Sequence, residues 1–215
     1  MTVVAIHTAV VPIKSWARSK TRLHPDPAVR LSLARAFAVD VLRAVIDCEL
    51  VGRVVVVSSE PDIGSLVEAV GATLLDEPAG ERPDPLNAAV LHGAGWAADR
   101  HPGDPLVVVP ADLPALTPES LADALVRARG WVSAFCADSP GTGTTLLVAA
   151  TPQLLVPAYG YASAQRHHAL GAAPLDGVDP RVRRDVDLVD DLHEAVVLGV
   201  GRSTQGVLSS LPQGG

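Results

Sequence analysis

The sequence is short of aromatic residues, cysteines and long apolar runs, and each shortage narrows the class of protein. Seven of the 215 residues are aromatic, so Val, Leu and Ala must fill the core, as in sheets covered by helices. Cys48 and Cys136 are too few and too far apart for a disulfide framework or a zinc knuckle. No apolar run reaches the roughly 18 residues of a membrane helix, and no secretory signal is visible. We therefore expect a cytoplasmic globular protein without a membrane segment.

Positive charge is also scarce, which argues against a nucleic-acid partner. The chain has 17 basic and 24 acidic residues, so its average surface repels a phosphate backbone. The only lysines, Lys14 and Lys20, lie with Arg18 and Arg22 in the segment PIKSWARSKTRL. A compact ammonium suits a triphosphate whose charge moves during reaction, and an arginine can bind two oxygens at once. We expect Lys14, Lys20 and Arg22 to hold a triphosphate; a solvated basic loop is the alternative.

Apolar runs alternate with helix-start signals along the chain, which predicts an α/β fold. Caps followed by proline at Asp26, Asp84 and Thr117 mark helix starts. Strands are expected at residues 2–11, 53–59, 73–76, 106–110, 131–137, 144–150 and 184–187. Helices are expected at residues 26–48, 63–70, 84–99, 117–129, 164–170 and 189–198. We find no linker or repeat, and so expect a single domain over residues 1–215 with a flexible tail from about residue 203.

The loop at residues 139–143 predicts an antiparallel pair inside an otherwise parallel sheet. Ligands of open α/β sheets bind near such reversals. The chain has no GxxxxGK[ST] motif, and no GxGxxG opens a helix, which argues against a P-loop nucleotidase and a dinucleotide fold. The segment GTGTT, from Gly141 to Thr145, lies between strands instead. Its backbone N–H groups and hydroxyls suit an anion, and a simple hairpin turn is the alternative.

Three carboxylates form a second candidate group. Asp112 follows an apolar strand in VVVPADLPAL, and Asp185 and Asp187 are two apart in RRDVDLVDD. Residues two apart on an extended segment project to the same side, where two carboxylates repel each other unless a cation lies between them. A hard cation such as Mg²⁺, bridging phosphates, would resolve that. Alternatively, Asp185 and Asp187 pair with the adjacent arginines and Asp112 is a turn former.

Two further polar residues lie at predicted helix starts. Asn87 is the only asparagine and falls in the first turn after PDP, where its amide could contact a base or ribose. The alternative is that it satisfies its own helix backbone. Ser163 is expected to be an N-cap whose helix start receives a phosphate or carboxylate. His167 and His168 have no companion at metal-ligand spacing, and no Ser or Cys elbow lies nearby in the sequence, so we expect no nucleophilic triad.

Six motifs together carry a family resemblance, in order and over nearly the whole chain. They are PIKSWARSKTRL, PDPLNAAV, VVPADLPAL, DSPGTGTTLL, YGYASAQRH and RRDVDLVDDL. In this combination the chain resembles the guanylyltransferases that make the deazaflavin coenzyme F-420. The resemblance implies a three-layer α/β/α, Rossmann-like nucleotidyltransferase fold with a mostly parallel mixed sheet. It also implies Mg²⁺, GTP as donor, a small phosphorylated carboxylic acid as acceptor, and transfer of the product to the next enzyme of the deazaflavin pathway.

The same resemblance assigns roles to particular residues. It implies that Thr144, Gly160 and Ser163 hold the acceptor phosphoenolpyruvate. It further implies that the metal aspartates are Asp112, Asp185 and Asp187. The chain departs from the family pattern at two places: Tyr159 replaces the usual Phe, and Leu188-Val189 replaces Thr-Pro.

The expected reaction is attack by an acceptor phosphate oxygen on the α-phosphorus of GTP, which expels pyrophosphate. A phosphate monoester is mostly dianionic at neutral pH, so no general base is needed. We favour phosphoenolpyruvate because the Ala-, Arg- and Val-rich composition resembles that of bacterial members. The alternatives are 2-phospho-L-lactate as acceptor, a related molybdopterin or sugar-phosphate nucleotidyltransferase, and a GTP-binding interaction protein. The two lysines argue against the last, because binding alone would tolerate Arg.

Overall fold

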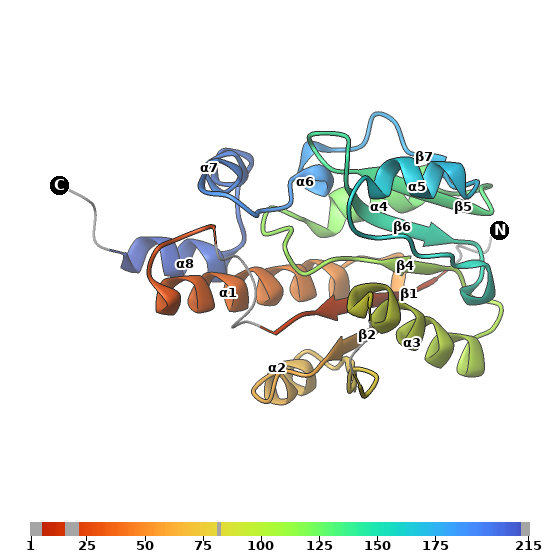
Figure 1. The fold of residues 1–215 in the computed structure, drawn as a ribbon, viewed down its shortest axis with the longest axis horizontal. Coiled ribbons are helices and arrows are strands. Elements are labelled where there is room, and N and C mark those ends of the chain that lie inside the picture. The colour runs from red at the N-terminus through yellow and green to blue at the C-terminus, as the bar shows by residue number, and fades with distance from the viewer. Residues whose placement is uncertain (1–5, 16–21, 81–82, 212–215) are drawn as a thin grey trace.

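A seven-stranded mixed sheet lies between layers of helices in the computed structural model, which describes residues 6–15, 22–80 and 83–211 (Figure 1). The strand order is β3-β2-β1-β4-β6-β5-β7. The strands are β1 His7–Ile13, β2 Val51–Ser58, β3 Thr73–Leu75, β4 Leu106–Val108, β5 Ser133–Ala137, β6 Thr144–Ala149 and β7 Ala173–Pro174. The helices are α1 Pro27–Ile46, α2 Gly64–Ala69, α3 Pro85–Arg100, α4 Pro118–Arg127, α5 Ser163–Ala169, α6 Pro180–Arg183, α7 Val189–Leu198 and α8 Arg202–Ser210, with a 3₁₀ turn at Pro152–Leu154.

Three long helices begin where the cap-and-proline signals predicted. The Asp26 carboxylate accepts a hydrogen bond from the Ala28 N–H at 2.8 Å, and Thr117 accepts one from the Ser120 N–H at 3.2 Å. Asp84 likewise accepts from the N–H of Asn87 at 3.2 Å. Each cap satisfies a backbone donor that the helix itself leaves unpaired. These starts fix which helix face meets the sheet.

The two faces of the sheet form two apolar cores. On β1, Ala9 and Val11 pack with α1, α2 and α4, whereas Val10 packs with α3 and α5. Successive residues of a strand point to opposite faces, so a continuous apolar run can serve both cores. A third cluster joins α1, α7 and α8 and includes the buried Val186. The observed arrangement is the three-layer α/β/α fold with a mixed sheet that the sequence predicts.

The antiparallel strand β6 brings distant loops to one edge of the sheet. β1 pairs in parallel with β2 and β4, whereas β6 runs antiparallel between β4 and β5. Val108 near the end of β4 lies opposite Leu147 of β6, so the start of β6 at Thr144 lies beside the carboxyl ends of β1 and β4. We call this side the switch edge, because the strand order reverses there between β1 and β4, where α/β proteins bind ligands.

The structure corrects two expectations about the last third of the chain. No strand forms at residues 184–187: Asp179 caps the short helix α6, and the chain then runs irregularly to α7. Val186 is anchored by burial of its side chain and by one hydrogen bond to the Asp112 carbonyl, at 3.0 Å. The expected flexible tail also contains a helix, α8, which lies along α1 (Figure 1). The buried carboxylate of Asp40 accepts from the N–H groups of Ser203 and Thr204, at 2.9 and 2.8 Å.

The helices that the structure describes are all too short or too polar to cross a bilayer.

Candidate functional site

Two of the residues predicted to hold the triphosphate and its metal ion follow strands that end at the switch edge. Lys14 is exposed and follows β1 directly, and Asp112 lies four residues beyond the end of β4. Arg22 is exposed shortly before α1. Lys20 lies outside the residues that the structure describes. The position of Lys14 at the reversal of the strand order is typical of a residue that contacts a bound ligand.

The loop between β5 and β6 is shaped by Asp138, which the sequence analysis did not single out. Its two carboxylate oxygens accept hydrogen bonds from the N–H groups of Thr142 and Gly143, both at 2.8 Å. A Cβ at residue 143 would collide with this carboxylate, so any side chain there would displace Asp138 from its two hydrogen bonds. These two N–H groups therefore bind Asp138, and the Thr145 hydroxyl donates to the Cys136 carbonyl, which leaves the hydroxyl of Thr144, at the start of β6, as the candidate donor to an anion. The only sequence signal for this role is an acidic residue at the start of DSPGTG.

Arg183 connects this loop to the segment that carries Asp185 and Asp187. Its guanidinium donates to the carbonyl oxygens of Ala137 at 3.1 Å and Asp138 at 2.7 Å. In return the N–H of Ser139 donates to the Arg183 carbonyl at 2.9 Å. The segment is thereby held between the β5–β6 loop and Asp112.

The three predicted metal aspartates come from neighbouring backbone segments. The N–H of Val186 bonds to the Asp112 carbonyl at 3.0 Å, and Asp185 and Asp187 lie on either side of Val186. Asp112 and Asp185 are half-buried and Asp187 is exposed. Across the described ranges, no three His, Cys, Asp or Glu side chains lie close enough together to hold a metal ion. Carboxylate oxygens nevertheless suit Mg²⁺, which commonly uses one or two carboxylates together with substrate phosphates.

The departure from the family pattern at Leu188-Val189 leaves the last predicted helix intact. α7 begins at Val189 as expected. The carboxylate of Asp191 accepts from the N–H groups of Leu188 and Asp187, at 2.8 and 3.1 Å, and so caps the helix start. Arg184 forms ion pairs with Asp191 and Glu194, which fixes this cap beside Asp187.

Asn87 holds the loop of Tyr159 and Gly160 in place. Its Oδ1 accepts from the Tyr159 N–H at 2.9 Å, and its Nδ2 donates to the Tyr159 carbonyl at 3.1 Å and to the Asp84 carboxylate. The guanidinium of Arg166 also donates to the Tyr159 carbonyl, at 2.9 Å. Both amide hydrogens of Asn87 are therefore used within the protein. The predicted contact of Asn87 with a base or ribose stays a prediction, and the contact with Tyr159 was not foreseen.

His167 links the start of β6 to the same loop. One ring nitrogen, Nδ1, lies 2.9 Å from the Thr144 hydroxyl oxygen, and the other, Nε2, accepts from the Ala158 N–H at 2.9 Å. The ring is fully buried, with Tyr159 edge-on at 5.2 Å between ring centroids. Burial is the main cause that lowers the pKa of His167 to about 4, and the charge of Arg166 lowers it further, while the Ser163 carbonyl partly offsets them. His167 is therefore neutral at physiological pH.

The three residues predicted to hold the acceptor come together around this link. Gly160 has φ of +114° and Ala162 has φ of +52°, a backbone that L side chains rarely adopt. Ala162 is the N-cap of α5, so Ser163 is the first helical residue and the prediction that it is the N-cap is wrong. The Ser163 N–H bonds to the Gly160 carbonyl at 3.1 Å, and the Ala164 N–H to the Thr142 carbonyl at 3.1 Å. Thr144, Gly160 and Ser163 thus belong to one hydrogen-bonded unit.

Tyr159 itself is buried, and its hydroxyl has no hydrogen-bond partner among the residues that the structure describes. Burial, and then the negative charge of Asp112, raise the pKa of this phenol. Tyr159 therefore stays neutral and serves as an apolar side chain in the core beneath α3, consistent with the Phe of the family pattern.

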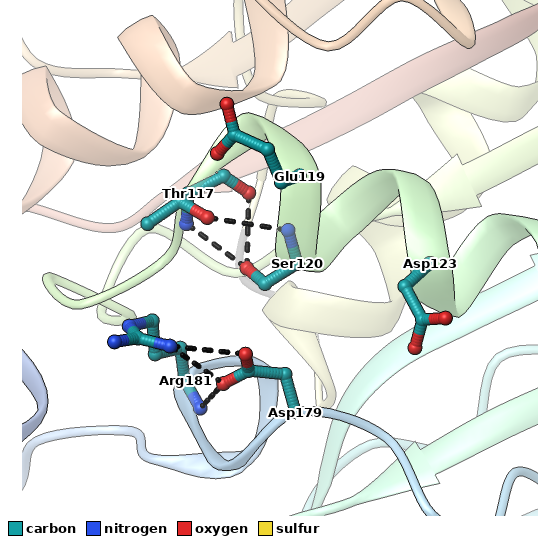
Figure 2. A pocket seen from close by; sticks show the side chains of 6 residues that line it. All are labelled: Thr117, Glu119, Ser120, Asp123, Asp179 and Arg181. Carbon is teal, nitrogen blue, oxygen red and sulfur yellow. Dashed lines mark hydrogen bonds and ion pairs between the residues drawn. The ribbon is translucent and has the colours of Figure 1, made fainter.

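A separate pocket lies between the start of α4 and α6. Figure 2 shows its side chains: Thr117, Glu119, Ser120, Asp123, Asp179 and Arg181. Within it, Thr117 and Ser120 cap α4, and Arg181 forms an ion pair with Asp179 at 3.0 Å (Figure 2). None of the predicted site residues lines this pocket, so it does not enlarge the site at the switch edge.

Comparisons with known proteins agree with this fold and with the motifs. The model of a family described as "Guanylyl transferase CofC like" matches residues 7–212. A relative from Streptomyces coelicolor, named "Phosphoenolpyruvate guanylyltransferase", is 44% identical over 209 residues, which cover 95% of this chain and 96% of the relative. A protein of the same name from Streptomyces scabiei is 45% identical with the same coverage.

A likeness to a solved structure supports the fold independently. The crystal structure of a 4-diphosphocytidyl-2C-methyl-D-erythritol synthase superimposes with a TM-score of 0.61 and 15% identity, covering 90% of this chain and 99% of the other. At this identity the likeness concerns the fold alone. The match over nearly all described residues, together with relatives above 40% identity, shows that the chain belongs to the guanylyl transferase CofC-like family.

Proposed function

We propose that the protein transfers GMP from GTP to phosphoenolpyruvate, forming enolpyruvyl-diphospho-guanosine and pyrophosphate. Family membership and the names of the two Streptomyces relatives support the reaction class and the acceptor. The observation that carries the proposal in this chain is the unit of Thr144, Gly160 and Ser163, linked through His167 at the switch edge. The product would pass to the next enzyme of coenzyme F-420 synthesis.

In this reaction an acceptor phosphate oxygen forms a bond to the α-phosphorus of GTP. The bond from that phosphorus to the oxygen bridging to the β-phosphate breaks, and its electron pair leaves with pyrophosphate. The attacking phosphate is already dianionic at neutral pH, so the protein has no proton to remove. Its task is to bring two polyanions together and to neutralise their charge.

The basic segment that follows β1 in the sequence suits the triphosphate. Lys14 is exposed beside the switch edge, and we propose that Lys14, Lys20 and Arg22 bind the β- and γ-phosphates and the departing pyrophosphate. Asp112, Asp185 and Asp187 are the candidate carboxylates for Mg²⁺: one or two of them would hold the ion together with substrate phosphates, and the ion would supply positive charge to those phosphates. Asn87 is a candidate nucleotide contact only through the second lone pair of its Oδ1, because both amide hydrogens bind Asp84 and Tyr159.

The acceptor would lie over the unit formed by the start of β6 and the start of α5. Phosphoenolpyruvate presents a carboxylate and a phosphate, whose oxygens only accept hydrogen bonds when ionised. Thr144 and Ser163 offer hydroxyl donors, and the left-handed backbone at Gly160 lets the chain turn without a side chain in the way. This arrangement supports a small acceptor that carries both a phosphate and a carboxylate.

Pyrophosphate release tests the proposal directly. The purified protein with Mg²⁺ is given each of GTP, ATP, CTP and UTP, with phosphoenolpyruvate, 2-phospho-L-lactate, a sugar phosphate or no acceptor. The proposal expects release that requires GTP and is greatest with phosphoenolpyruvate. Release that prefers CTP with a sugar phosphate would point to a related nucleotidyltransferase instead. GTP binding without release in the presence of any acceptor would contradict enzymatic activity.

A further inference from the structure

We infer that His167 is a positioning residue that fixes the Thr144 hydroxyl as a hydrogen-bond donor to the anionic group of the acceptor, an inference that rests on the proposed function. His167 is fully buried, and both ring nitrogens are engaged across the site. The residue lies one turn into α5 from Ser163 and was not assigned a role by its spacing. Its two contacts determine which atoms carry hydrogens.

The contact with Ala158 fixes the tautomer of the ring. A backbone N–H can only donate, so Nε2 of His167, 2.9 Å from the Ala158 nitrogen, must be the acceptor. A neutral imidazole carries one hydrogen, and with Nε2 bare it must lie on Nδ1. Nδ1–H therefore donates to the Thr144 hydroxyl oxygen at 2.9 Å, and it shares this hydrogen with the Ser163 carbonyl, which also accepts from the ring.

This donation sets the direction of the Thr144 hydroxyl. With the oxygen accepting from His167, its own hydrogen is directed elsewhere and is available to a ligand. Carboxylate and phosphate oxygens only accept, so a hydroxyl fixed as a donor suits them. A hydroxyl that rotates freely would also turn its lone pairs toward the anion, and the two would repel each other. It would in addition lose rotational freedom when the acceptor binds.

The same ring holds the surrounding backbone. Ala158 directly precedes Tyr159 and Gly160, so one side chain connects the start of β6, the left-handed loop and α5. The rings of Tyr159 and Phe135 lie 5.2 and 6.0 Å from the imidazole, centroid to centroid. These two rings restrict the orientation of the imidazole, as a residue that positions the Thr144 hydroxyl requires.

Two substitutions separate the contacts of His167. His167→Asn keeps a donor near the position of Nδ1 and loses the acceptor for Ala158. His167→Gln reaches the position of Nε2 with its carbonyl and loses the donor to Thr144. His168→Gln, on the exposed neighbour, is the matched control. Thermal unfolding of all three variants identifies any that fails to fold.

Steady-state kinetics with GTP and phosphoenolpyruvate then measure each variant. We expect His167→Gln to raise the KM for phosphoenolpyruvate about tenfold, because the Thr144 hydroxyl is no longer fixed as a donor and its hydrogen bond to the anionic acceptor is weakened. The KM for GTP should stay within about twofold, and His167→Asn should retain most of the affinity for the acceptor. In a Thr144→Val background, His167→Gln should add little, because the two residues act through one hydrogen bond. Equal effects of His167→Gln and His168→Gln, or full additivity with Thr144→Val, would overturn the inference.

The ring tautomer gives a second readout that does not depend on activity. Long-range ¹⁵N–¹H spectra of the wild type, with the His167 signals assigned by their loss in His167→Asn, should show the hydrogen on Nδ1. A hydrogen on Nε2 would overturn the inference even in an active enzyme. A wild type that converts neither phosphoenolpyruvate nor 2-phospho-L-lactate would overturn both the proposed function and this inference. An active wild type with an unaffected His167→Gln variant would overturn the inference alone.

Discussion

Replacing Asn87 by Ala removes the side chain that holds the Tyr159 loop against α3. The Tyr159 N–H then loses its partner, and its carbonyl keeps only the guanidinium of Arg166. Because Tyr159 is buried and Asn87 is 8% exposed, water replaces these bonds poorly. An unsatisfied buried donor costs about 1 to 3 kcal/mol, and the lost bond to the carbonyl adds about 1 kcal/mol. We therefore expect the free energy of unfolding to fall by about 2 to 4 kcal/mol.

This loss should be visible in both stability and kinetics. For a domain of this size it corresponds to a fall in Tm of about 4 to 16 °C. The KM for phosphoenolpyruvate should also rise, because the loop carries Gly160. His92→Ala on the exposed face of the same helix is the control and should change neither. Unchanged stability in Asn87→Ala would refute the role we give to this contact, and a rise confined to the KM for GTP would indicate a nucleotide contact instead.

Three further predictions concern backbone strain, pH and charge. Gly160→Ala should destabilise the protein by about 1 to 2 kcal/mol, because φ is +114° there, whereas Ala162→Gly should change stability by less than about 1 kcal/mol in urea unfolding. The pKa of His167 is lowered to about 4 from 6.5 mainly by burial. The stabilisation that neutral His167 gives to the folded state is therefore complete above pH 6.5 and is lost as pH falls toward 4. The difference in unfolding free energy between the wild type and His167→Gln should shrink by up to roughly 3 kcal/mol over that range. A difference that does not change with pH would contradict this. Asp112→Asn should lower kcat/KM by about 10²- to 10³-fold, with Asp123→Asn on α4 as the control, and a change of only a few fold would contradict a charge role for Asp112.

Local signals in the sequence predicted most of the helix starts and the sheet. Asp26, Asp84 and Thr117 cap their helices as expected, since a cap and the proline after it act over three or four residues. The antiparallel strand β6 also follows from local signals, namely a turn-rich loop between two apolar runs. These features need no knowledge of which distant segments meet.

Contacts between distant segments account for what the sequence analysis missed. Asn87 and Tyr159 are 72 residues apart, and Asp40 caps α8 from a position 163 residues earlier. Neither pairing leaves a periodic pattern in the sequence. Residues 184–187 were expected to form a strand, but Val186 is instead buried beside α1 and α7 and does not join the sheet.

The candidate site likewise contains residues that the sequence predicted and residues that only the structure shows. The family motifs predicted Thr144, Gly160 and Ser163, and the structure brings them into one hydrogen-bonded unit. The residues that hold this unit, Asp138 and His167, are visible only in three dimensions, because their partners are backbone groups and a hydroxyl. The motif residues therefore indicate the chemistry of the family, whereas Asp138 and His167 fix the positions of the groups that would carry it out.

A competition between two acceptors tests the central claim most directly. The wild-type protein receives GTP, Mg²⁺ and equal concentrations of phosphoenolpyruvate and 2-phospho-L-lactate, and the masses of the guanylylated products are measured during the first turnovers. The two acceptors differ in geometry at C2 and by one pair of hydrogens, which an apolar pocket distinguishes by about 1 to 3 kcal/mol. We predict that enolpyruvyl-diphospho-guanosine predominates by roughly 10-fold or more. Predominance of lactyl-diphospho-guanosine would contradict the assigned acceptor, and absence of both products would contradict guanylyl transfer itself.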